Sequence, residues 1–131
     1  MTEPNIRVAI VEDHTVVRQG LVSLLGAQSG LEVVGHGGSG FEGLRLVREH
    51  RPDVLVLDLS LPDMSGIDVI AEVTRDLPSC RVVVLSMHSE ASYVRPAIRA
   101  GAAGYLVKGA DIGDLVEAIR CVMRGEPFLS P

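Results

Sequence analysis

The chain has 131 residues, of which 47% are hydrophobic and 22% are charged, a composition typical of one soluble globular domain. Its formal net charge of -5 argues against a segment that grips a nucleic-acid backbone by itself, and no apolar run approaches the roughly 20 residues of a membrane helix. The first residues lack the basic and apolar regions of a signal peptide, so we expect a cytoplasmic protein without membrane contact.

Short apolar runs alternate with helical patterns along the chain. The continuous runs are typical of strands buried on both faces of a sheet. We predict five such strands, at 6–11, 31–36, 53–58, 81–86 and 103–107. Between them, apolar residues recur at helical spacing, most regularly from Ile112 to Met123. This alternation favours right-handed crossovers and a parallel sheet, and therefore an α/β fold.

Several residues predict where the helices begin and end. Ser39-Gly40-Phe41-Glu42 is a capping box that starts a helix near residue 40, and Asp111 can cap the last helix. Pro96 falls inside the expected fourth helix, 90–100, so this helix either begins near Pro96 or is kinked. The glycine and the prolines of 125–131 predict a linker that leaves the domain.

Four of the predicted strands end on charged or hydroxyl residues. Glu12 and Asp13 follow the first strand, and the strand endings further along are Asp58, Ser86 and Lys108. The carboxyl ends of parallel strands meet at one edge, where such sheets bind ligands. Neighbouring carboxylates repel each other unless a cation or a proton intervenes, and hard oxygen ligands suit Mg²⁺. We therefore predict a magnesium site formed by carboxylates at this edge.

The same residues fit phosphoryl transfer, in which a metal and an amine neutralise the transferred group. Asp58 is the best candidate for a carboxylate nucleophile, because it opens the loop after a central strand. Ser86 can donate a hydrogen bond to the arriving phosphoryl oxygen, and Lys108 supplies a fixed positive charge. The histidines are scattered and suggest no transition-metal site, and the two cysteines are interpreted as reduced thiols.

Together these motifs resemble the receiver domain of response regulators over nearly the whole chain. The matching segments, in order, are Val11-Glu12-Asp13, Asp58-Leu59-Ser60-Leu61-Pro62 with Gly66, Leu85-Ser86-Met87-His88 and Gly104-Tyr105-Leu106-Val107-Lys108. Leu85-Ser86-Met87-His88-Ser89 and Phe128-Leu129-Ser130-Pro131 look most like the NarL/FixJ (LuxR-type) subfamily, whose members usually continue into a helix-turn-helix domain.

The resemblance implies a flavodoxin-like (βα)5 sandwich with a five-stranded parallel sheet of order 2-1-3-4-5. It implies that Asp58 is the phosphoacceptor and Lys108 the phosphate partner, with Ser86 and Tyr105 as switch residues. Mg²⁺ would be held by the side chains of Glu12, Asp13 and Asp58 and by the backbone carbonyl of Ser60.

The resemblance also implies a signalling switch rather than an enzyme, acting only on its own aspartyl phosphate. A histidine kinase or a small phosphodonor would supply the phosphoryl group. We expect a receiver domain at 1–124 and, at 125–131, the start of a linker to a C-terminal DNA-binding domain. Homodimerisation on phosphorylation is expected, and direct nucleic-acid contact by this segment is not. Gly109 stands where many receivers have a proline in a cis peptide, so we expect no cis bond there.

Two alternatives remain at the level of the sequence. Gly35-His36-Gly37-Gly38-Ser39-Gly40 spells the glycine pattern of dinucleotide-binding folds, although it sits on the second strand and leaves Glu12, Asp13 and Lys108 without a role. A Mg²⁺-dependent aspartyl-phosphate phosphatase would also use Asp58, but it needs a second aspartate two residues later, where this chain has Ser60.

Overall fold

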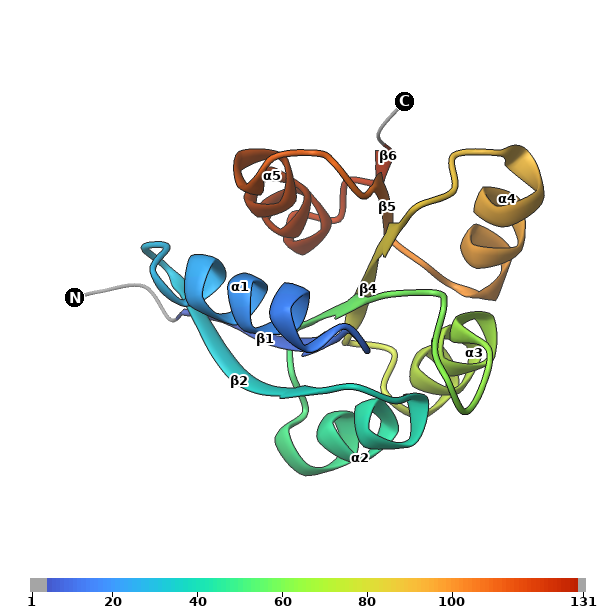
Figure 1. The fold of residues 1–131 in the computed structure, drawn as a ribbon, viewed down its shortest axis with the longest axis horizontal. Coiled ribbons are helices and arrows are strands. Elements are labelled where there is room, and N and C mark those ends of the chain that lie inside the picture. Colours follow the sequence, from blue (N-terminus) through green and yellow to red (C-terminus); the bar gives the residue numbers. More distant parts are fainter. Residues whose placement is uncertain (1–4, 130–131) are drawn as a thin grey trace.

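Strands and helices alternate along residues 5–129, the part of the chain that the structure, a computed structural model, describes (Figure 1). The strands are β1 (Ile6–Val11), β2 (Leu31–Gly37), β3 (Val54–Leu57), β4 (Arg81–Ser86), β5 (Gly104–Val107) and β6 (Phe128–Leu129). The helices are α1 (Thr15–Gly26), α2 (Gly40–His50), α3 (Gly66–Asp76), α4 (Ala91–Ala100) and α5 (Ile112–Met123).

All strand pairs are parallel, and the strands follow the order β2-β1-β3-β4-β5-β6. Helices α1 and α5 lie on one face of the sheet, and α2, α3 and α4 lie on the other (Figure 1). The α/β class, the flavodoxin-like arrangement and the order 2-1-3-4-5 are therefore confirmed.

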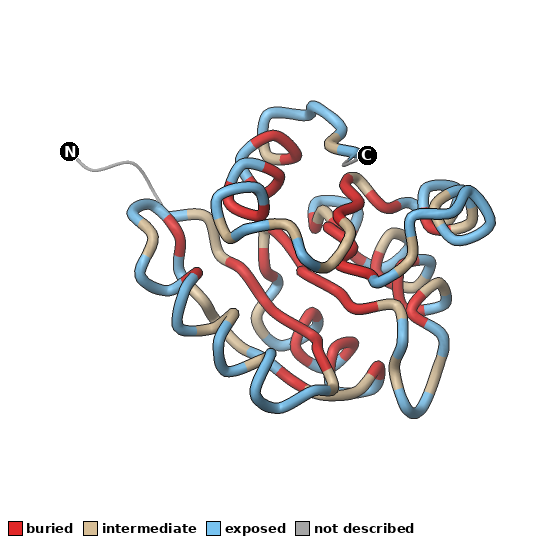
Figure 2. Tube along the Cα trace, turned by 45° about the horizontal axis from the view of Figure 1, so that its top comes forward, coloured by how far each residue is buried: buried red, intermediate tan, exposed pale blue. Residues whose placement is uncertain are grey.

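The core consists of two apolar layers separated by the sheet, and the strands run through its interior (Figure 2). Successive side chains of a strand point to opposite faces, so β1 supplies both layers. Val8 and Ile10 pack with α1 and α5, whereas Ala9 and Val11 pack with α2 and α3. Burial on both faces explains why the strands read as continuous apolar runs.

The prediction of five strands is corrected by a sixth, β6, which lies within the predicted linker. Phe128 and Leu129 pair with Gly104 and Tyr105 of β5, and the Phe128 amide donates to the carbonyl of Ala103 at 3.3 Å. The ring of Phe128 packs against the core layer next to α5, which ties this short strand to the domain. The glycine and prolines around Phe128 and Leu129 led to the prediction of a linker in place of this strand. The last residues of the predicted linker, 130–131, lie outside the described residues.

The predicted helix signals are present in the structure. Ser39 Oγ accepts a hydrogen bond from the Glu42 amide at 3.2 Å, and Asp111 Oδ1 accepts one from the Asp114 amide at 2.9 Å. Helix α4 begins at Ala91, well before Pro96, so the alternative that it begins near the proline is wrong. Among the described helices, none has both the length and the apolar character needed to cross a bilayer.

Candidate functional site

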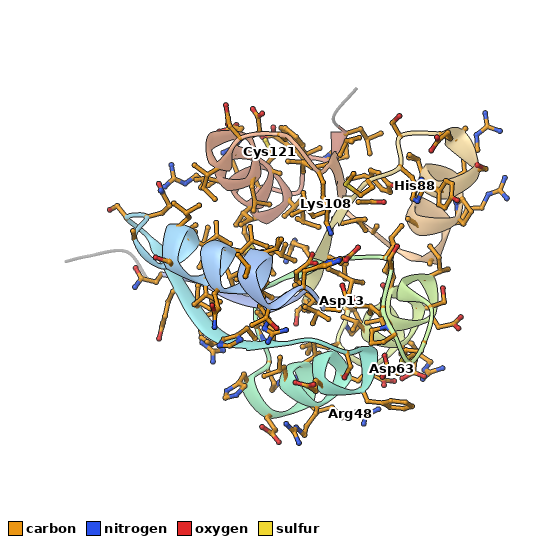
Figure 3. The ribbon with its side chains drawn as sticks, viewed as in Figure 1. Asp13, Arg48, Asp63, His88, Lys108 and Cys121 are labelled. Carbon is orange, nitrogen blue, oxygen red and sulfur yellow. The ribbon has the colours of Figure 1, made fainter. Side chains whose placement is uncertain are left out.

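The parallel sheet brings the predicted polar residues to one edge. β1 leads into Glu12 and β3 into Asp58, and the Asp58 amide donates to a β1 carbonyl at 3.0 Å, so the strand pairing continues past the strand ends. In the same way, the Lys108 amide donates to the carbonyl of Ser86 at 2.6 Å. In Figure 3, Lys108 and Asp13 both lie at this edge of the sheet.

One amine is shared between two buried carboxylates. Lys108 Nζ lies 3.0 Å from Glu12 Oε2 and 3.1 Å from Asp58 Oδ2. The side chains of Glu12 and Asp58 are only 2% and 3% exposed. A buried negative charge is expensive unless it is paired, so Lys108 compensates two charges with one.

The two carboxyl groups respond differently to this environment. Burial raises the pKa of Asp58, and the Glu12 charge adds to the rise, while the amide of Ser60 and the amine of Lys108 oppose it. The Ser60 amide donates to Asp58 Oδ1 at 3.1 Å. Burial also disfavours ionisation of Glu12, but hydrogen bonds from His14 and Lys108 outweigh it and hold its pKa below the ordinary value. Glu12 is thus the more firmly ionised of the pair.

The donor atoms at this edge fit a divalent cation. Glu12, Asp13 and Asp58 each offer a carboxylate oxygen within 4.8 Å of the others. Glu12 Oε2 and Asp13 Oδ1 are buried and accept no hydrogen bond of good geometry, although Lys108 Nζ and His14 Nδ1 lie 3.0 Å and 3.2 Å from them, respectively. Buried carboxylate oxygens that lack such bonds are costly on their own and are suitable ligands for a hard ion such as Mg²⁺.

The predicted switch residues lie beside the carboxylates and share one contact. Ser86 is 1% exposed, and its Oγ accepts a hydrogen bond from the His88 amide at 3.1 Å. Tyr105 is also 1% exposed, and its hydroxyl donates to the His88 carbonyl at 2.6 Å. Burial raises the pKa of Tyr105, so the hydroxyl stays protonated as a donor. Both side chains are therefore fixed to the backbone of one residue.

Two further residues, to which sequence reasoning assigned no role in the site, make contacts here. His14 was interpreted as a scattered histidine, yet its Nδ1 lies 2.9 Å from Glu12 Oε1. Asp63 accepts hydrogen bonds from the amides of Gly40 at 2.8 Å and Phe41 at 3.0 Å, and these bonds lower its pKa. From the sequence, Asp63 is interpreted as either a solvated loop residue or a helix cap, and the structure shows that it caps α2, a helix that begins more than 20 residues earlier in the chain.

The contact of Asp63 also bears on the glycine-rich alternative. A dinucleotide would place its pyrophosphate on the amides at the start of the helix that follows the glycines. In this structure Asp63 already occupies the first amides of α2, and the side chain of Met64 packs closely against Gly40. The glycines permit this packing of a neighbouring loop, and the helix end has no free place for a phosphate.

Comparison with known proteins identifies relatives that match almost the whole chain. Residues 8–120 match the family model of the response regulator receiver domain. The chain is 39% identical over 126 residues to the response regulator GacA of Pseudomonas viridiflava, covering 96% of this chain and 59% of that protein. It is 40% identical over 124 residues to the transcriptional regulatory protein LiaR of Bacillus subtilis, covering 95% and 59%.

Solved structures give the same result. The crystal structure of a two-component response regulator of the LuxR family from Aurantimonas sp. SI85-9A1 superposes with a TM-score of 0.91 at 34% identity, covering 97% of this chain and 91% of that one. The signal receiver domain of the putative response regulator NarL from Mycobacterium tuberculosis gives a TM-score of 0.89 at 34% identity, covering 95% and 100%. The chain spans 59% of the length of the GacA and LiaR relatives.

Proposed function

The chain belongs to the family of response regulator receiver domains, which are signalling switches, and we propose that Asp58 is the residue that accepts the phosphoryl group. The observation that carries this proposal is the shared amine: Lys108 lies within 3.1 Å of Asp58 at the edge where the other carboxylates gather. An amine in that place neutralises charge on an incoming phosphoryl group, which is the main requirement for its transfer.

In the proposed step, an Asp58 carboxylate oxygen forms a bond to phosphorus while the bond from phosphorus to the donor breaks. The donor is the phosphohistidine of a histidine kinase, which leaves as a free imidazole, or acetyl phosphate, which leaves as acetate. The side chains of Glu12, Asp13 and Asp58 and the backbone carbonyl of Ser60 would hold a Mg²⁺ ion, which would neutralise charge on the phosphoryl oxygens. The Ser60 amide orients Asp58 by its hydrogen bond to Oδ1.

The switch follows from the contacts of Ser86 and Tyr105. We propose that the Ser86 hydroxyl donates to a phosphoryl oxygen on Asp58. Ser86 now accepts from the amide of His88, whose carbonyl holds Tyr105, so a shift of Ser86 acts on the segment that leads into α4. Phosphorylation adds negative charge and acceptor oxygens at Asp58. Through Ser86 and His88, this change alters the conformation of the surface around α4.

We further propose that the switch controls transcription through a DNA-binding part that follows the receiver, reached through a linker that begins near 125–131. The relative named as the transcriptional regulatory protein LiaR supports this, because the match covers 95% of this chain but only 59% of that longer protein. The exposed apolar residues of α1, Val16 at 82% and Leu24 at 49%, support homodimerisation as the mode of activation.

Intact-mass spectrometry with acetyl phosphate tests the assignment of Asp58. The wild-type chain should gain the mass of one phosphoryl group in Mg²⁺ and none in a chelator, and Asp58→Asn should gain none in either. Asp76→Asn, at the exposed end of α3, is the matched control and should be labelled like the wild type. Labelling of Asp58→Asn to the wild-type stoichiometry would refute the assignment.

A further inference from the structure

The histidine that follows Glu12 and Asp13, the two acidic residues after β1, points into the site. His14 Nδ1 lies 2.9 Å from Glu12 Oε1 and 3.2 Å from Asp13 Oδ1. One ligand atom from each of Glu12, Asp13, His14 and Asp58 can be chosen so that all four lie within 4.8 Å of one another. The site therefore contains, among its carboxylate oxygens, a nitrogen atom that can act as a metal ligand.

A second observation shows that this cluster is open to a ligand. Glu12 is 2% exposed, and its Oε2 is buried without a hydrogen-bond donor. Lys108 Nζ lies 3.0 Å from that oxygen but outside hydrogen-bonding geometry. A buried carboxylate oxygen facing three other potential ligands is left with a lone pair that a metal ion can use.

The donor set distinguishes between metals. Mg²⁺ prefers oxygen in octahedral geometry and gains little from an imidazole, whereas Zn²⁺ binds imidazole nitrogen and carboxylate oxygen in tetrahedral sites. Bonds of about 2.0–2.1 Å in a tetrahedron place the ligand atoms roughly 3.3 Å apart. The four atoms lie within 4.8 Å of one another, so a contraction of up to roughly 1.5 Å for the widest pair would reach that geometry.

We propose that this edge is also a zinc site, in which His14 joins the carboxylates of Glu12, Asp13 and Asp58. A tetrahedral ion with four protein ligands has no open position for a phosphoryl oxygen, whereas Mg²⁺ keeps positions that water or a phosphoryl oxygen can fill. Zinc thus competes with Mg²⁺ and keeps the receiver unphosphorylated. The inhibitory part of this inference rests on the proposed function, while the binding part stands on the geometry alone.

Titration calorimetry with Zn²⁺ and with Mg²⁺ tests the binding part. The pH should be well above the ordinary histidine pKa of about 6.5, because the hydrogen bond to Glu12 and the charge of Asp13 raise the pKa of His14. His14→Gln should lower the ratio of Zn²⁺ to Mg²⁺ affinity by on the order of tenfold or more. His36→Gln is the matched control, because His36 is exposed on β2 and outside the cluster, and it should leave the ratio unchanged. An unchanged ratio in His14→Gln would overturn the proposal.

Co²⁺ in place of Zn²⁺ gives an independent readout. The wild type should show the visible absorption of tetrahedral Co²⁺ with nitrogen and oxygen ligands, and His14→Gln should lose it. Near-ultraviolet absorption typical of thiolate ligands would instead place the ion at a cysteine and would also overturn the proposal.

Phosphoryl labelling in Mg²⁺ with added Zn²⁺ separates the two proposals. Failure of the wild type to be labelled without Zn²⁺ would contradict the proposed function and leave the calorimetric result intact. Normal labelling that one equivalent of Zn²⁺ does not reduce would contradict the inhibitory role of zinc alone.

Discussion

Replacement of Lys108 by methionine should destabilise the fold strongly, because it removes the single cation that faces two buried carboxylates. Each carboxylate oxygen lies 3.0–3.1 Å from the amine, which corresponds to a gross Coulomb attraction of about 5 kcal/mol per pair at an effective dielectric constant of about 20. Desolvation of the three groups cancels much of that attraction in the wild type. In the variant the desolvation of the two carboxylates remains and the attraction is lost.

We therefore expect Lys108→Met to lower the free energy of unfolding by about 3 kcal/mol at neutral pH, the lower end of the range for breaking a buried ion pair. The lower end applies because burial already raises the pKa of Asp58, so this carboxyl can take up a proton and relieve part of the repulsion. In the Asp58→Asn background only Glu12 remains uncompensated, and the same replacement should cost about 1.5 kcal/mol less.

Urea unfolding followed by circular dichroism, in a chelator, measures all four members of this cycle. Arg45→Met removes an exposed cation that pairs with Glu49 and is the control for loss of charge, with an expected change near zero. Additive effects of Lys108→Met and Asp58→Asn would refute the reasoning, because they would mean that the amine and the Asp58 carboxylate do not share an interaction.

Other substitutions test separate parts of the structure. Since burial raises the pKa of Asp58, the wild-type fold loses stability as the pH rises through that pKa. Asp58→Asn should therefore be more stable than the wild type at neutral pH, on the order of 1 kcal/mol, and this gain should vanish in acid. Urea unfolding at several pH values measures the difference. Tyr105→Phe removes the donor to the His88 carbonyl and should cost about 1 kcal/mol in the same melts, whereas an unchanged midpoint would argue against that bond. Gly66→Ala places a Cβ 2.6 Å from the backbone of the preceding loop and should destabilise the fold by about 2 kcal/mol. Gly20→Ala, in α1, places a Cβ with no other atom within 4 Å and should stabilise the fold by about 0.5–1 kcal/mol. Thermal unfolding of the two variants checks that the effects have opposite signs.

The sequence was sufficient to predict the sheet and its acidic edge, because both depend on rules that act along the chain. Continuous apolar runs require burial on both faces, and parallel strands bring their last residues together. Glu12, Asp13, Asp58 and Lys108 were found for that reason. The placement of Ser86 at the end of β4 follows from the same rule.

Contacts between distant segments could not be predicted in this way. Asp63 caps α2 from a loop more than 20 residues away in sequence, and β6 forms because Phe128 finds an apolar layer to pack against. His14 enters the site only because the chain turns after Asp13 and aims the imidazole back at Glu12. The Asp63 and β6 contacts depend on tertiary geometry, about which local patterns carry no information. The His14 contact is between residues two apart in the chain, but no sequence motif marks it.

Lys108 is the one lysine in the 131-residue chain, whose other side-chain cations are all arginines or histidines. A compact ammonium with three donors can contact two carboxylates at once and can turn toward a phosphoryl group without losing its charge. A planar guanidinium would favour one carboxylate in a two-point contact and would need more space in a site where Glu12 is 2% exposed. Lys108→Arg should therefore recover part of the stability lost in Lys108→Met but little of the phosphoryl labelling. Full recovery of both, measured by urea unfolding and intact mass, would mean that charge alone is required at this position.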